Sequence, residues 1–156
     1  MDVLDHPSFA EIKNFILQNL KNYRDDVIRP KYDMKLVITE SWLNYTNYNQ
    51  QHHFHKHNNS YLSGVFYINT IENDGIKFFN DGGGLFNMFD IESEDLHTYN
   101  APSWELPVST GQLLLFPSDL QHGVKVNKEN KTRISLSFNT FLKGQISSKR
   151  TVGLKI

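Results

Sequence analysis

The chain has 156 residues, which is enough for one domain with a buried core and an internal pocket. Its 16 Lys and Arg nearly balance its 17 Asp and Glu, so no net field draws it to nucleic acid or to an anionic membrane, and neither is expected as a partner. The absence of cysteine excludes disulfides, thiolate metal ligands and cysteine nucleophiles. No signal segment and no run of about 18 apolar residues is evident, so a cytoplasmic protein is expected.

One amphipathic helix is predicted near the N-terminus, over about residues 8–28. Ser8 and Glu11 have the spacing of a capping box, in which both side chains accept hydrogen bonds from free backbone N–H groups. Apolar side chains then recur every three or four positions, at Phe9, Ile12, Ile16, Leu20, Tyr23 and Val27. Pro30 limits this helix, and its apolar stripe should pack against a sheet.

The remainder of the chain has the two-residue period of β-strands. Aromatic residues make up 13% of the sequence, and many stand in short alternating runs. Strands are predicted over residues 35–39, 62–69, 76–80, 112–116 and 133–140. The segment from Asn80 to Pro107 is rich in glycine, acids and proline, so it is predicted to be a long loop with at most one short strand, serving as a lid or substrate wall.

Four histidines lie within the seven residues from Gln51 to His57. On a strand, alternate side chains share a face, so His55 and His57 would point towards one position. His122 is the candidate third ligand because it follows a buried strand that ends at Pro117. Two other interpretations remain open at this point, namely a solvated polar loop for the cluster and a structural role for the single His122.

The strand that begins at Arg133 has one apolar and one polar face. Its polar side chains are Arg133, Ser135, Ser137 and Asn139. Facing outward they would form an ordinary amphipathic strand, but facing into a barrel they would form a ligand-binding wall. Arg133 offers a planar, permanently charged fork for a carboxylate, and Ser135 lies on the same face. A dicarboxylic co-substrate held there could chelate a metal through a 2-oxo acid group at its other end.

Several further side chains are candidates for the same site. Tyr67 could donate its hydroxyl to the co-substrate or belong to the core, and Asn139 could touch substrate or co-substrate. Trp42 is interpreted as a packing residue. His52 and His53 are either spare ligands or exposed, and His6 and His97 are expected at the surface.

Taken together, these blocks resemble the Fe(II)- and 2-oxoglutarate-dependent oxygenases, and in particular a group common in phages and marine bacteria. The resemblance runs from about Thr39 to Asn139 and rests on four blocks in this order: Glu40–Asn44, His55–Tyr67, Leu115–Ser118 and Arg133–Asn139. In that superfamily a His-x-Asp/Glu pair, a distal His and a basic residue about ten positions later form the site. Here the offset from His122 to Arg133 is 11 residues, and His57 stands where the superfamily has a carboxylate.

The resemblance implies a mainly β fold, a double-stranded β-helix (a jelly-roll or cupin-like barrel) with the N-terminal helix packed on its sheet. It implies one domain over residues 1–156, with the barrel at about 34–141 and a C-terminal tail at 142–156. His55, His57 and His122 would bind Fe(II) and act as the catalytic centre. Arg133, Ser135, Tyr67 and Asn139 would bind 2-oxoglutarate.

The activity implied is that of a 2-oxoglutarate-dependent dioxygenase, by default a hydroxylase, that uses O₂ and in some cases ascorbate. Its substrate would be a small molecule or a peptidyl side chain, and the chain would be a monomer or homodimer in the cytoplasm, that of the host for a phage-encoded protein. Two alternatives stay open. One is a cupin-type metalloprotein without 2-oxoglutarate, in which Arg133 has no assigned role, and the other is a non-enzymatic barrel used in assembly.

Overall fold

The computed structural model describes residues 2–79, 92–97 and 100–147. Its helical segments are η1 (Val3–Asp5), η2 (Pro7–Phe9), α1 (Ala10–Asn22) and the π-helical η3 (Tyr23–Ile28). The strands are β1 (Met34–Thr46), β2 (His52–His55), β3 (Leu62–Asn69), β4 (Gly75–Phe79), β5 (Ser103–Pro107), β6 (Leu113–Pro117), β7 (Gln121–Val124) and β8 (Arg133–Gly144). Among these residues, no helix is long and apolar enough to cross a membrane.

The N-terminal helical region begins differently from the prediction. The capping box at Ser8 is wrong, because a 3-10 turn precedes α1 and moves its N-cap to Phe9, which makes no side-chain cap. The ring of His6 instead accepts a hydrogen bond from the Ser8 backbone N–H, at 3.3 Å from Nδ1. The helical region ends at Arg29, whose φ of 49° is left-handed, directly before Pro30.

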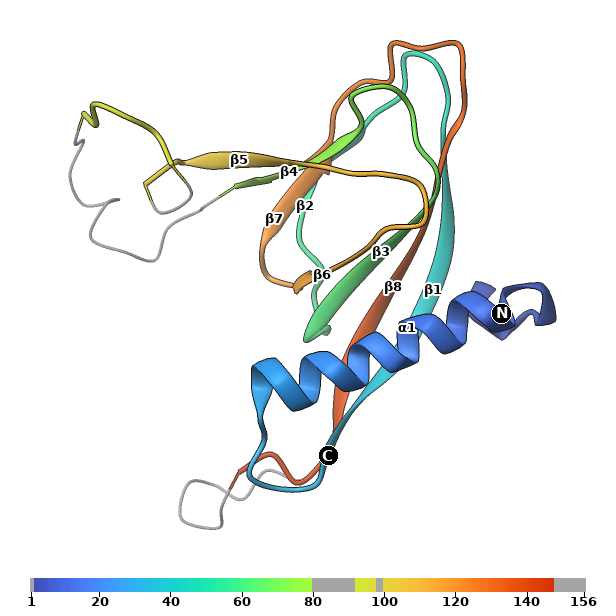
Figure 1. The fold of residues 1–156 in the computed structure, drawn as a ribbon, viewed down its shortest axis with the longest axis vertical. Helices are drawn as coiled ribbons and strands as arrows, with labels where there is room; N and C mark the ends of the chain where they lie inside the picture. The colour runs from blue at the N-terminus through green and yellow to red at the C-terminus, as the bar shows by residue number, and fades with distance from the viewer. Residues whose placement is uncertain (1, 80–91, 98–99, 148–156) are drawn as a thin grey trace.

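Eight strands form two antiparallel four-stranded sheets. The larger sheet has the order β1-β8-β3-β6, and the smaller has the order β2-β7-β4-β5. Together they form a double-stranded β-helix, so the predicted mainly β fold is confirmed. Figure 1 shows α1 lying across the strands of the larger sheet, away from β2, β4, β5 and β7.

Sequence periodicity identified β1, β3, β4, β6 and β8 but missed the two four-residue strands, β2 and β7. β7 was not predicted, because four residues that include a histidine and a glycine carry no recognisable alternation. β5 is the one short strand described inside the predicted loop, and parts of that loop lie outside the described residues, as does Asn80. β1 runs to Thr46, well past its predicted end, after a bulge between Ile38 and Glu40.

Two apolar clusters stabilise the fold. The first lies between the helices and the larger sheet, where Ile16 and Leu20 pack near Leu136 and Phe138 of β8. The second lies between the two sheets and contains Tyr67, Ile76, Phe78, Val108 and Phe116. Because helices cover the outer face of β8, its apolar side chains point outward, and its polar side chains face the space between the sheets. That space contains the candidate site.

Candidate active site

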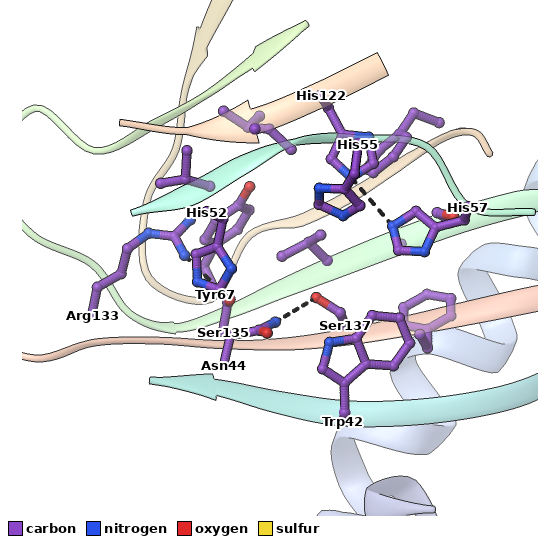
Figure 2. Close-up of a pocket in the computed structure, with 18 residues that line it drawn as sticks. Trp42, Asn44, His52, His55, His57, Tyr67, His122, Arg133, Ser135 and Ser137 are labelled. Atoms are coloured by element: carbon purple, nitrogen blue, oxygen red, sulfur yellow. Dashed lines mark hydrogen bonds between the residues drawn. The ribbon is translucent and has the colours of Figure 1, made fainter. Parts of the chain in front are cut away.

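A pocket lies between the two sheets, with His55, His57 and His122 at one end and Arg133 at the other (Figure 2). Strand register creates its polar wall. Thr46 pairs with Arg133, Ser135 pairs with both Asn44 and Tyr67, and Ser137 pairs with both Trp42 and Val65. Each of these cross-strand sets therefore points to the same face of the larger sheet. The predicted inward orientation of the polar face of β8 is observed.

His55 and His122 are brought together by pairing of β2 with β7. They are directly opposite in the register, and their ring centroids are 4.6 Å apart. β2 advances three residues, from His52 to His55, while β7 advances two, from Val124 to His122, so β2 contains a bulge. The bulge lets His52 and His55 face the same pocket despite their odd spacing.

His57 reaches the cluster by a different route from the one predicted. β2 ends at His55, so His57 lies beyond the strand and strand alternation does not place it. Its backbone N–H instead donates to the carbonyl of Ser118, at 2.9 Å, in the turn between β6 and β7. That turn also leads to His122, so one turn positions two of the three histidines.

The three imidazoles direct ring nitrogens towards one position. Nε2 of His57 and Nε2 of His122 are 3.3 Å apart, and the ligand atoms of all three histidines lie within 4.8 Å of one another. Nδ1 of His122 lies 2.9 Å from the Leu120 carbonyl, and Nδ1 of His55 lies 2.8 Å from the His53 carbonyl. A carbonyl only accepts, so each Nδ1 carries the proton and each Nε2 keeps its lone pair for a metal.

The environment favours the neutral form of His57 and His122. The pKa of His122 is lowered to about 4, mainly by burial and to a smaller extent by the nearby His55 and His57, while the hydrogen bond to the Leu120 carbonyl opposes the shift. Burial, followed by the proximity of His55, also lowers the pKa of His57. Neutral imidazoles are the form that binds metal ions. Among the described residues, this metal-binding group contains histidines and no carboxylate.

The outer side of His57 faces a polar network. Its Nδ1 lies 3.2 Å from Nδ2 of Asn139, which also donates to Glu40 at 2.6 Å. The amide oxygen of Asn139 accepts from Ser63, whose hydroxyl also contacts Ser118 at 2.9 Å. Asn139 is thus placed behind a histidine and is not among the side chains that line the pocket.

Arg133 forms the opposite end of the pocket and is only 1% exposed. Its Nε donates to both carboxylate oxygens of Asp74, each at 2.9 Å. Nη1 lies 3.3 Å from the Ser135 hydroxyl, and the guanidinium carbon lies 5.2 Å from the centre of the Tyr67 ring. Sequence reasoning missed Asp74, because Asn73-Asp74-Gly75 has the composition of a solvent-exposed turn. The one sequence signal that could have revealed Asp74 is that an arginine on the inward face of a strand requires a charged or polar partner.

Tyr67 is fully buried beside this ion pair. Its hydroxyl is the one buried side-chain polar atom in the described part of the chain without a hydrogen-bond partner. Burial raises its pKa, so the group is protonated and available as a donor. Buried polar groups almost always have partners. An orphaned donor beside Arg133 and Ser135 therefore fits a ligand carboxylate.

The remaining predicted residues divide between the pocket and the surface. His52 lines the pocket, with Nε2 2.8 Å from the Thr46 hydroxyl, and its pKa is lowered by burial and then by Arg133. Trp42 also lines the pocket, with its ring centre 5.7 Å from that of His57. The other histidines, His6, His53 and His97, are exposed.

The sequence matches one protein family over residues 40–139, a span that contains every histidine of the cluster as well as Asp74 and Arg133. This family is described as "Putative 2OG-Fe(II) oxygenase", and the chain belongs to it. The four sequence blocks from Glu40 to Asn139 resemble the same family. No curated protein sequence matches the chain.

Solved structures with the same fold include oxygenases. An oxidoreductase of the 2OG-Fe(II) oxygenase family from Burkholderia pseudomallei aligns with a TM-score of 0.60 at 12% identity, covering 86% of this chain and 56% of that protein. HygX from Streptomyces hygroscopicus, with nickel and 2-oxoglutarate bound, aligns with a TM-score of 0.59 at 16% identity, covering 89% of this chain and 69% of HygX. The structure of HygX with iron bound gives a TM-score of 0.57 at 16% identity, covering 87% of this chain and 68% of HygX. At these identities the likeness concerns the fold, and the chain spans little more than half of the Burkholderia protein.

Proposed function

We propose that this protein is an Fe(II)- and 2-oxoglutarate-dependent hydroxylase that oxidises a C–H bond of a small-molecule or peptidyl substrate. The single observation that carries the proposal is the arrangement of the pocket. Three imidazoles with converging nitrogens lie at one end, and a buried arginine with an unsatisfied tyrosine hydroxyl lies at the other. A 2-oxo dicarboxylate has complementary groups at its two ends.

His55, His57 and His122 are the proposed metal ligands. The backbone carbonyls beside His55 and His122 fix the tautomers that expose Nε2. The bound iron would supply the oxidising chemistry, in which O₂ and 2-oxoglutarate give succinate, CO₂ and a hydroxylated substrate. HygX, which has the same fold, binds iron in one structure and nickel with 2-oxoglutarate in another, which supports this assignment.

Arg133, Ser135 and Tyr67 are the proposed partners of the distal carboxylate of 2-oxoglutarate. The Arg133 hydrogen bonds to Asp74 are donated by Nε, so the terminal Nη groups are not committed to that ion pair. The Ser135 hydroxyl and the ring of Tyr67 adjoin the guanidinium. Hydrogen bonds that a guanidinium donates to a carboxylate are stronger than those between neutral groups. Trp42 and His52 would enclose the co-substrate and exclude water.

Ultraviolet and visible spectroscopy under anaerobic conditions tests the proposal. The apo protein is mixed with Fe(II) and 2-oxoglutarate, and the weak visible charge-transfer band of the chelate is titrated. Wild type and the exposed-site control His53→Ala should both give the band, while His57→Ala should not. Tyr67→Phe removes only the unpaired hydroxyl, so it should keep the band and weaken 2-oxoglutarate binding by about tenfold.

A second candidate function is a cupin-type metalloprotein that does not use 2-oxoglutarate. The observation in its favour is that Arg133 already has a carboxylate partner, as an arginine with a purely structural role would have. In that case wild type would bind Fe(II) without developing a band on addition of 2-oxoglutarate. The Tyr67→Phe substitution would then leave every measured property of the metal site unchanged.

A further inference from the structure

We propose that Asp74 sets the strength of the distal carboxylate site by neutralising Arg133, so that a dicarboxylate is held tightly only when its other end reaches the metal. This inference rests on the proposed function, because it assumes that Arg133 meets the co-substrate. It assigns Asp74 as a positioning residue, since its carboxylate acts through Arg133 and does not line the pocket.

The first step concerns where the charges lie. Among the described side chains that line the pocket, Arg133 alone carries a permanent charge. Asp74 is not among the residues that line the pocket, and the Arg133 and Asp74 side chains are 2% and 0% exposed. Both carboxylate oxygens lie 2.9 Å from Nε. At such separations and with so little solvent, each charge offsets part of the field of the other, although His52 still feels the charge of Arg133.

The second step is that Asp74 offsets part of the charge of Arg133 but leaves its terminal donors available. Asp74 is bound through Nε, whereas Nη1 is directed towards Ser135 inside the pocket. The distal site therefore offers Nη and two hydroxyl groups in fixed positions without a net positive charge. A carboxylate that enters it loses hydration and gains hydrogen bonds, but no uncompensated cation attracts it.

The third step compares the charges at the two ends. Imidazole ligands bring no charge to a divalent metal ion, whose +2 is then matched by the two carboxylates of 2-oxoglutarate. The +1 of Arg133 is matched by Asp74. The charges of the metal, the co-substrate, Arg133 and Asp74 therefore sum to zero.

This arrangement distinguishes co-substrate from product. The charge of the metal can hold 2-oxoglutarate through its 2-oxo acid group, but succinate lacks that group. With Arg133 neutralised, the distal site alone does not retain succinate or the related dicarboxylate glutarate. Release of the product follows from the same ion pair that gives Arg133 its position.

The experiment is isothermal titration calorimetry on Asp74→Asn. The amide oxygen can still accept the hydrogen bond from Nε of Arg133, so the substitution removes the charge and keeps the contact. Glutarate is titrated into metal-free and Ni(II)-loaded protein, and 2-oxoglutarate is titrated into the Ni(II)-loaded form. Asp5→Asn is the control, because it removes the same charge from an exposed ion pair with Lys13.

We expect metal-free wild type and Asp5→Asn to bind glutarate weakly, and Asp74→Asn to bind it at least about tenfold more tightly, with a gain that shrinks as salt is added. A purely structural Asp74 predicts the opposite sign, because a displaced Arg133 would lose affinity. An unchanged or lower glutarate affinity in folded Asp74→Asn overturns the inference.

The wild type provides a second test that requires no substitution. Its Ni(II)-loaded form should bind 2-oxoglutarate at least about a hundredfold more tightly than glutarate, and equal affinities would overturn the inference even if Asp74→Asn failed to fold. If Ni(II)-loaded wild type does not bind 2-oxoglutarate at all, the proposed function fails, and this inference fails with it. The two failures are therefore distinguishable.

Discussion

The two ends of the pocket are built in different ways. The histidine end is assembled from β7, the last residue of β2 and the segment beyond it. Backbone carbonyls orient two of its rings, and the third contacts the side chain of Asn139. The arginine end is built on the long strand β8, is buried almost completely, and depends on a charged partner from the start of β4. Hydrogen bonds to neutral groups position the histidine end, whereas a buried ion pair positions the arginine end.

Because of this difference, substitutions at the two ends should have different effects on metal binding and on the stability of the fold. Loss of a histidine leaves no unpaired charge in the interior, so the protein should still fold while metal affinity is lost. Loss of either member of the Arg133–Asp74 pair leaves an unpaired charge in the interior, so the fold itself should be weakened. The following experiments test that contrast.

Arg133→Ala should have the largest effect. It should lower the free energy of unfolding by about 3–5 kcal/mol, because the buried Asp74 carboxylate loses its charged partner. Urea denaturation of the apo protein measures this. The double variant Arg133→Met with Asp74→Leu should recover most of the loss, since it removes both charges. A double variant no more stable than Arg133→Ala would show that the ion pair is not the cause.

His122→Ala should abolish metal binding with little effect on folding. Removal of a direct ligand should cost more than the roughly 10–100-fold in metal affinity typical of a lost outer partner. Competition between the protein and a chelator for Ni(II) measures it, with His53→Ala as the control because that ring is exposed. Unchanged Ni(II) affinity in His122→Ala would place the metal elsewhere.

Acidification should destabilise the apo protein. The pKa of His122 is about 4 in the folded state against an ordinary value of 6.5, so the unfolded chain binds more protons between these values. This contribution to stability is therefore present above about pH 6.5 and is lost as the pH falls towards 4, by on the order of 1–3 kcal/mol. Urea midpoints at several pH values measure it. His122→Asn should reduce the change in stability between pH 6.5 and 4. An unaltered dependence of stability on pH would show that His122 is not its cause.

Asn139→Ala should have the smallest effect on the metal site, weakening Ni(II) binding by about tenfold. The side chain touches the outer nitrogen of His57, so its loss frees the ring to rotate. Asn69→Ala is a matched control, because Asn69 also makes a partly buried hydrogen bond, to the Thr132 carbonyl, away from the histidines. Equal Ni(II) affinities for the two variants would mean that Asn139 does not orient His57.

The chain order of the strands and the candidate ligands could be read from local patterns. The alternation from Arg133 to Asn139 predicts a wall with one polar face, and the histidine-rich segment predicts ligands near β2. What could not be predicted depends on contacts between distant segments. Asp74 is 59 positions from its partner, and its neighbours resemble a turn. The hydrogen bond that positions His57 comes from Ser118, which is equally remote in sequence.

The bulge in β2 has a consequence for how this protein can vary. Because three residues of β2 lie opposite two of β7, the orientation of His55 depends on the number of residues after His52 as well as on their identity. Deletion of Phe54 would restore regular pairing and also remove the ring that packs over Gly123. Substitutions at His53 or Phe54 should therefore be accepted far more readily than a change in length. Between His52 and His55, we therefore expect substitutions to be tolerated and insertions or deletions to displace His55 from the metal site.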